Sequence, residues 1–119
     1  MEEKYSSSLE HLVKNYIYSK IGANTLSYNP HHNKDLKRIV PSENDTYFRK
    51  GILKGFVHDM GAAMQGGVGG HAGLFGNSLD VAKIMQLYLQ KGNYGNAELF
   101  SSTVFDEFNK CHFCDDNVR

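Results

Sequence analysis

The side chains best suited to acid and base chemistry in this sequence are two histidines and an aspartate. His58 and Asp59 are adjacent, and His71 lies in a glycine-rich segment over residues 66–76. Imidazole titrates near neutral pH and a carboxylate can fix its tautomer, so these residues are the candidates for proton transfer. Adjacent residues of an extended chain point to opposite sides, so His58 and Asp59 are not expected to pair with each other.

Both histidines also have a structural interpretation, which the pattern favours. For His58 it is a hydrogen bond to a loop carbonyl. For His71, accessible backbone N–H groups nearby would suit the binding of an anion. The favoured structural interpretation is that residues 66–76 make a tight buried crossing, in which His71 bonds to the backbone.

A serine nucleophile needs a base beside it, and no recognisable pair of this kind occurs. No serine has a lysine three residues later, and neither a Gly-x-Ser-x-Gly turn nor a Lys-Thr-Gly triplet is present. Residues 94–96 have the Tyr-x-Asn form that some serine hydrolases use, but they follow Gly92 and Asn93 in an evident turn, which favours coincidence. We therefore expect no catalytic residue within the chain.

The sequence predicts neither a cofactor nor a metal site. Residues 67–72 fit Gly-x-Gly-x-x-Ala, but a dinucleotide site needs this motif at the start of a helix, and the next helix begins only at Asn77. Cysteine and histidine could bind zinc, but no second cluster accompanies them at the usual spacing. These potential ligands are His31, His32, Cys111, His112 and Cys114.

Composition and charge argue against several classes of partner. The chain has 119 residues with 13 basic and 13 acidic side chains, and its pI is near 7.0. It therefore lacks the basic surface that nucleic acids and anionic membranes attract. No apolar run approaches the roughly 20 residues that span a bilayer, so neither partner is expected. The length predicts a single domain over residues 1–119.

Three helices are predicted, over about residues 7–21, 77–91 and 102–110. The first begins with a capping box at Ser7 and Glu10 and ends at Gly22, where a left-handed residue can close it. Asn77 caps the second. Apolar spacing assigns five residues to the inner face of this second helix. They are Val81, Ile84, Met85, Tyr88 and Leu89.

A long loop and a short ribbon are predicted between the first two helices. Residues 23–45 are rich in turn formers and have no helical period. Two β-prone runs, at about 38–41 and 52–57, are expected to pair as an antiparallel β-ribbon. The predicted fold class is therefore α+β, mainly α.

Four segments, taken in order, resemble one known family. They are RIVPSEND at residues 38–45, FR at 48–49, GFVHD at 55–59 and GGVGGHAGLF at 66–75. From its first helix to about Phe108, the chain resembles the β-lactamase-related serine hydrolases. This is the class C β-lactamase and penicillin-binding-protein-like group.

The resemblance implies a position inside a larger hydrolase domain. Members of the family use Ser-x-x-Lys, Tyr-x-Asn and Lys-Thr-Gly or His-x-Gly motifs, of which two would precede residue 7 and one would follow Arg119. Residues 71–73 have the His-x-Gly form, but by position they match the glycine-rich turn before the second helix. The chain is thus expected to be an inactive internal helical-subdomain fragment of an enzyme that hydrolyses amide or ester bonds through an acyl-enzyme.

The same resemblance implies partners and a role for the candidate residues. The partners would be the rest of the parent hydrolase domain and a small-molecule or peptidoglycan-type substrate, in a bacterial parent of periplasmic or extracytoplasmic location. His58, Asp59 and His71 are then candidates for the substrate cleft. One alternative is a non-catalytic module that binds a cell-wall-type ligand. Another is a small metal-binding protein.

Overall fold

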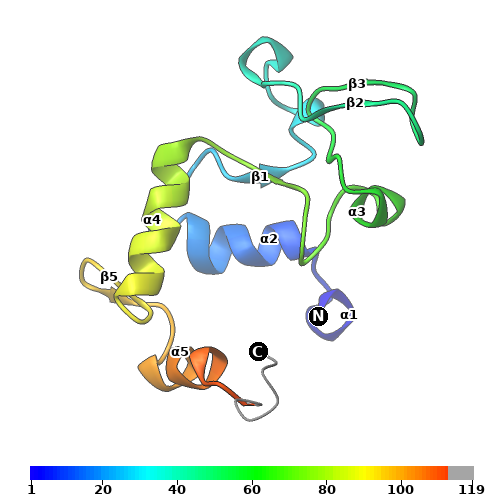
Figure 1. Ribbon diagram of the computed structural model, residues 1–119. Helices are drawn as coiled ribbons and strands as arrows, with labels where there is room; N and C mark the ends of the chain where they lie inside the picture. Colours follow the sequence, from blue (N-terminus) through cyan, green and yellow to red (C-terminus); the bar gives the residue numbers. More distant parts are fainter. Residues whose placement is uncertain (113–119) are drawn as a thin grey trace.

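The computed structural model describes residues 1–112, in which short elements surround one longer helix (Figure 1). The helical elements are α1 (Glu2–Tyr5), α2 (Leu9–Val13), the π-helical turn η1 (Lys14–Tyr18), the 3-10 turns η2 (Pro30–His32) and η3 (Leu36–Arg38), α3 (Met60–Met64), α4 (Ser78–Leu89) and α5 (Ser102–Asn109). The strands are β1 (Ser27–Tyr28), β2 (Glu43–Asp45), β3 (Gly51–Leu53), β4 (Leu74–Phe75), β5 (Asn93–Tyr94) and β6 (Ala97–Glu98). They pair antiparallel as β1–β4, β2–β3 and β5–β6. The α+β class is therefore confirmed.

The helix predicted over 7–21 is formed by α2 and η1, but it begins later than expected. Ser8, not Ser7, is its N-cap, and the Ser8 hydroxyl accepts from the backbone N–H three residues on at 3.3 Å. Glu10 does not close a capping box, because its carboxylate accepts from the backbone N–H of Tyr28 in β1 at 3.2 Å. A contact with a distant strand has replaced the local one.

The helices predicted over 77–91 and 102–110 are α4 and α5. Asn77 caps α4 as expected, with its side-chain oxygen 2.8 Å from the third backbone nitrogen of the helix. The predicted inner face is only partly right, because Leu87 is buried and Ile84 packs beside it. The other four predicted members are exposed. They are Val81, Met85, Tyr88 and Leu89.

The predicted β-ribbon exists, but its first strand lies further along the chain. Residues 38–41 do not form it; β2 spans Glu43–Asp45 and pairs with β3. The carboxylate of Asp35 accepts from the backbone N–H of Lys37 at 2.9 Å, which starts the 3-10 turn that ends at Arg38. The second predicted strand, 52–57, is also shorter, since β3 ends at Leu53. The short elements α1, α3, β1, β4, β5 and β6 were not predicted.

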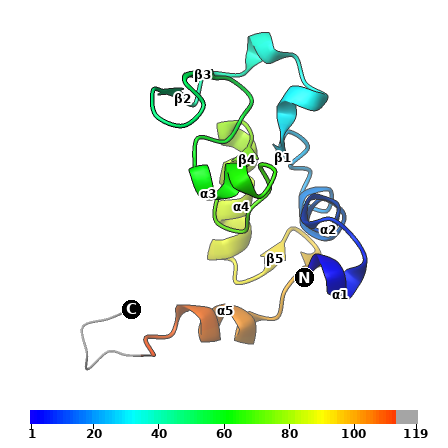
Figure 2. The same ribbon diagram turned by 90° about the vertical axis from the view of Figure 1, so that its right-hand side faces the viewer.

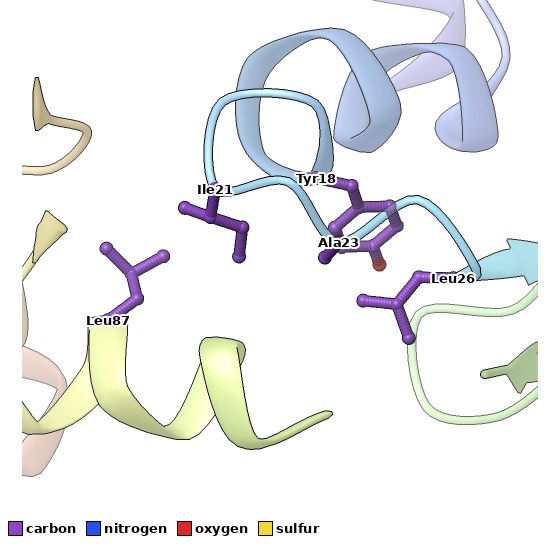
Figure 3. Close-up of a cluster of buried hydrophobic side chains, with 5 residues drawn as sticks. All are labelled: Tyr18, Ile21, Ala23, Leu26 and Leu87. Carbon is purple, nitrogen blue, oxygen red and sulfur yellow. The ribbon is translucent and has the colours of Figure 1, made fainter. Parts of the chain in front are cut away.

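One small hydrophobic cluster joins the N-terminal helix to α4. It lies between η1, the segment that follows η1, and α4, and Figure 3 shows Leu87 of α4 pointing toward Ile21. Burial raises the pKa of the Tyr18 hydroxyl to about 12. The buried members are Tyr18, Ile21, Ala23, Leu26 and Leu87.

A buried carboxylate, Asp80, joins α4 to the segment before β1. It accepts from the backbone N–H and the hydroxyl of Thr25 and from the ammonium of Lys83, each at 2.7 Å. Lys83 also donates to the carbonyl of Gly22, whose φ of +67° agrees with its predicted left-handed conformation. The Lys83 ammonium and the Thr25 donors lower the pKa of Asp80 to about 2. The start of α4 is thus held by hydrogen bonds to an ionised group.

Much of the surface stays exposed. The accessible area is 8929 Å², against roughly 6,500 Å² for a compact monomer of this mass. The radius of gyration is 16.6 Å, against about 13.5 Å for a compact domain of this length. The β2–β3 ribbon and α5 lie at opposite ends of the molecule in both views (Figures 1 and 2). None of the helices in residues 1–112 is long and apolar enough to cross a membrane.

Replacing the hydroxyl of Thr25 is expected to loosen α4. The Thr25→Val variant keeps the shape of the side chain but removes one donor to Asp80, and it should lower the free energy of unfolding by about 1–3 kcal/mol. Urea denaturation followed by far-UV circular dichroism measures this change. Thr25→Ser keeps the hydroxyl and is the control. Equal midpoints for the Val and Ser variants would show that the hydroxyl contributes nothing.

Candidate functional site

The candidate site is built outward from Asp45, a buried carboxylate at the end of β2. Its Oδ1 accepts from the backbone N–H of Tyr47 at 2.9 Å and of Phe48 at 2.8 Å. Its Oδ2 accepts from the backbone N–H and the side-chain Nε of Arg49, both at 3.0 Å. The backbone donors of Arg49 and Phe48, together with the guanidinium, hold the pKa of Asp45 well below its usual range. An ionised Asp45 therefore folds residues 45–49 into a turn.

Arg49 also connects the Asp45 turn to the segment that follows β3. Its two terminal nitrogens donate to the carbonyl oxygen of Val57 and, at 2.7 Å, to that of His58. A planar guanidinium offers donors in several fixed directions, so one side chain can hold the carboxylate and both carbonyls at once. The backbone immediately before Asp59 is therefore tied to the β2–β3 ribbon.

Asp59 links the start of α3 to His71. Its Oδ1 accepts from the backbone N–H of Ala62 at 2.7 Å and lies 3.1 Å from Nε2 of His71. The Ala62 N–H and then the His71 ring lower the pKa of Asp59. An ionised carboxylate only accepts, so Nε2 of His71 carries the hydrogen and Nδ1 faces away from Asp59. The two side chains are 59% and 39% exposed, which leaves the pair open to solvent.

The glycine-rich segment that carries His71 is held against β1. The hydroxyl of Tyr28 donates to the carbonyl of Gly69 at 3.2 Å. The side-chain amide of Asn29 donates to the carbonyl of Gly66 at 2.8 Å. The side chains of Tyr28, in β1, and Asn29, directly after it, thus determine the path of the segment and the position of the His71 imidazole.

The structure brings two of the three predicted site residues together. His71 bonds to the carboxylate of Asp59, so the expectation that it bonds to the backbone is wrong. His58 offers its own carbonyl to Arg49, and its ring makes no hydrogen bond within residues 1–112, so the predicted bond from the ring to a loop carbonyl is also wrong. Arg49 was missed, because bonds to distant carbonyls leave no spacing pattern; its only local sign is Asp45 four residues earlier.

A pocket of about 250 Å³ lies beside Arg49. One wall is His31, whose ring stacks on Phe56 with centroids 3.9 Å apart and whose Nδ1 lies 2.9 Å from the carbonyl of Gly55. Asn29 also lines the pocket. The region can thus offer hydrogen bonds and an aromatic face to a ligand.

The other motifs do not add to this site. Tyr94 packs against the hydrophobic core at the β5–β6 hairpin, so the Tyr-x-Asn triplet lies in a turn as expected. Within the described part of the chain, no three His, Cys, Asp or Glu side chains gather into a metal-binding group. Cys114, one of the potential ligands, lies outside the described residues.

Three related proteins share the name "Putative D-alanyl-D-alanine carboxypeptidase". The one from Escherichia coli O157:H7 is 34% identical to this chain over 121 residues, covering 91% of the chain. The one from Escherichia coli strain K12 is 33% identical over the same share. The Salmonella agona protein is 32% identical over 86% of the chain. This chain is similar to proteins with a peptidase name, which agrees at that level with the penicillin-binding-protein-like resemblance.

The match covers only part of each relative. The chain spans 28% of the length of each Escherichia coli protein and 26% of the Salmonella protein. No model of a known protein family matches the chain. No solved structure matches it either.

Acid is expected to destabilise the site through Asp45. Because the pKa of Asp45 in the folded protein lies below the usual value of about 3.9, its ionisation stabilises the fold above that pH. This contribution shrinks as the pH falls below about 3.9 and has disappeared below the lowered folded-state pKa. Urea midpoints at pH 7 and pH 3 should therefore differ less in Asp45→Asn than in the wild type. Glu98→Gln, on exposed β6, controls for the loss of one charge; an unchanged difference in Asp45→Asn would contradict the prediction.

A methyl group at Gly73 is expected to disrupt the segment that carries His71. Gly73 has a φ of +110°, and a Cβ there would lie 2.3 Å from the carbonyl oxygen of Gly67. Gly73→Ala should cost about 2 kcal/mol or more and shift the NMR signals of His71. Gly70→Ala is the matched control, because nothing lies within 4 Å of its added Cβ. Similar stabilities for the two variants would contradict the clash.

Proposed function

We propose that this chain forms one wall of the substrate cleft of a D-alanyl-D-alanine carboxypeptidase-like serine hydrolase related to class C β-lactamases. The observation that carries the proposal is 34% identity, along 91% of the chain, to a protein of that name. The ordered segments between residues 38 and 75 also support it, since they include the turn of Asp45, the carbonyls that Arg49 holds, and His71.

The bond-breaking groups would come from outside these 119 residues. A carboxypeptidase that acts on a D-alanyl-D-alanine end breaks the last peptide bond and releases one D-alanine. In the serine mechanism, the hydroxyl oxygen attacks the carbonyl carbon, the C–N bond breaks, and the leaving amine takes a proton. Water then cleaves the acyl-serine ester. No serine here has a lysine three residues later, so the nucleophile and its base belong to the rest of the parent domain.

The Asp59–His71 pair would contact the substrate from this wall. Both side chains are open to solvent, and Nδ1 of His71 is directed away from Asp59, where it can accept a hydrogen bond from a peptide N–H. His58 places a second exposed imidazole next to the pair. Their role is contact with substrate, and Arg49 acts as a positioning residue behind them.

The rest of the parent domain is the proposed partner of the uncovered apolar side chains. On α4, Met85 is 55% exposed and Leu89 is 79% exposed, and on α5 Phe108 is 84% exposed. Contiguous exposed apolar surface marks an interaction site in soluble proteins. Packing of a neighbouring part of the domain on α4 and α5 accounts for these faces.

The second candidate is a non-catalytic module that binds a cell-wall-type ligand. The observation that favours it is the combination of an exposed Asp59–His71 pair with the absence of a Ser-x-x-Lys motif. Saturable NMR shifts confined to residues 56–76 on titration with muropeptides, without turnover by the longer gene product, would support this candidate over the hydrolase.

The purified 119-residue chain is expected to hydrolyse nothing, because it lacks the nucleophile and its base. The measurement is turnover of a chromogenic β-lactam, a p-nitrophenyl ester and a peptide ending in D-alanyl-D-alanine. A longer gene product that includes this chain, where the source DNA encodes one, is the positive control. Turnover by the 119-residue chain that a serine-directed inhibitor abolishes would overturn the proposal.

A further inference from the structure

A separate pocket of about 410 Å³ lies between the η2–η3 region and the start of α4. Strand β1 forms part of its floor. Tyr28 of β1 points toward the glycine-rich segment, since its hydroxyl bonds to Gly69. Successive residues of a strand point to opposite faces, so Ser27 points away from that segment and toward this pocket, which it lines. The pocket is therefore distinct from the Asp59–His71 site.

Ser27 carries a buried hydroxyl without a partner. The residue is 7% exposed, and its Oγ makes no hydrogen bond in the described part of the chain. Buried polar groups in folded proteins nearly always have a partner, and an exception requires an explanation. A ligand atom in the pocket would supply the missing acceptor.

Two cations line the same pocket. Lys34 and Arg38 form no ion pair with any residue from 1 to 112. One acidic residue, Asp35, also lines the pocket, so the lining carries two positive charges against one negative charge. The lining also includes Asn77, the N-cap of the twelve-residue helix α4, whose N-terminal half carries the Asp80–Lys83 ion pair. These charges favour an anion.

Apolar side chains complete the lining. Val40 and Phe75 belong to it, and Val40 is 80% exposed. A volume of about 410 Å³ lies in the range of small-molecule pockets. We propose that this pocket binds a small carboxylate with an apolar substituent. Lys34 and Arg38 pair with the carboxylate, the Ser27 hydroxyl donates to it, and the substituent packs on Phe75. The proposal does not depend on the proposed hydrolase function.

The binding test uses the 119-residue chain and two-dimensional NMR. The probe is 3-phenylpropionate, and 3-phenylpropanamide is the uncharged control. The expected result is saturable shifts at residues 27 and 75–77 with the acid and none with the amide. Equal binding of the amide, or an equal affinity for inorganic phosphate, would overturn the proposal, because the carboxylate or the apolar wall would then contribute nothing.

Variants distinguish a binding role from a structural one. Lys34→Ala combined with Arg38→Ala should weaken binding at least about tenfold, whereas Lys37→Ala, on the same 3-10 turn, should leave it unchanged. Ser27→Ala should weaken binding about tenfold without lowering the urea midpoint of the unliganded chain, since the hydroxyl has no bond to lose. Unchanged binding in the double variant, or a destabilised Ser27→Ala with normal binding, would overturn the assignment.

Discussion

The ion pair between Asp45 and Arg49 is the contact on which the Asp59 half of the candidate site depends. Asp45 is buried, and a buried carboxylate is tolerated only when its oxygens are fully hydrogen-bonded. Two backbone donors satisfy part of this demand, and Arg49 supplies the rest. The same guanidinium then holds the carbonyls of Val57 and His58, so one buried charge determines where the chain enters α3. Together with the bond from the Ser42 hydroxyl to the carbonyl of Phe56 at 2.8 Å, this link fixes the backbone that presents Asp59 relative to the β2–β3 ribbon.

Two carboxylates, Asp45 and Asp80, therefore hold together segments that a larger hydrophobic core would hold in a larger domain. The core cluster has five buried members next to α4, and only four further apolar side chains are buried in the elements around the site, namely Tyr28, Leu53, Val57 and Ala62. Asp80 bridges 55 positions of sequence to Thr25, and Asp45 with Arg49 joins the ribbon to the start of α3. Apolar side chains of α4 and α5 remain uncovered at the same time. Hydrogen-bonded charged groups thus join segments that the core cluster does not reach.

Local signals in the sequence predicted the elements that local forces build. Asn77 and the apolar spacing after it were sufficient for α4, because a cap and its helix lie within a few residues of each other. The ribbon was misplaced because the 3-10 turn that Asp35 starts takes in Arg38, the first residue of the β-prone run, and strand pairing begins only at Glu43. The predicted inner face of α4 was wrong at four of its five residues, since periodicity identifies an apolar stripe but not whether the chain covers it. The contacts of Arg49 with distant carbonyls have no periodicity, so no pattern predicted them.

The Asp59–His71 pair is positioned more tightly than its own stability requires. Ion pairs between exposed side chains contribute little to folding, and both of these side chains are exposed. Even so, Arg49 fixes the backbone before Asp59, and Tyr28 bonds to the carbonyl of Gly69 two residues before His71. Several independent contacts thus fix the position of an imidazole that contributes little to the stability of the fold. Precise positioning of an exposed imidazole is needed when it contacts a group outside the chain, and contact with a substrate is the role that the proposed cleft wall gives to His71.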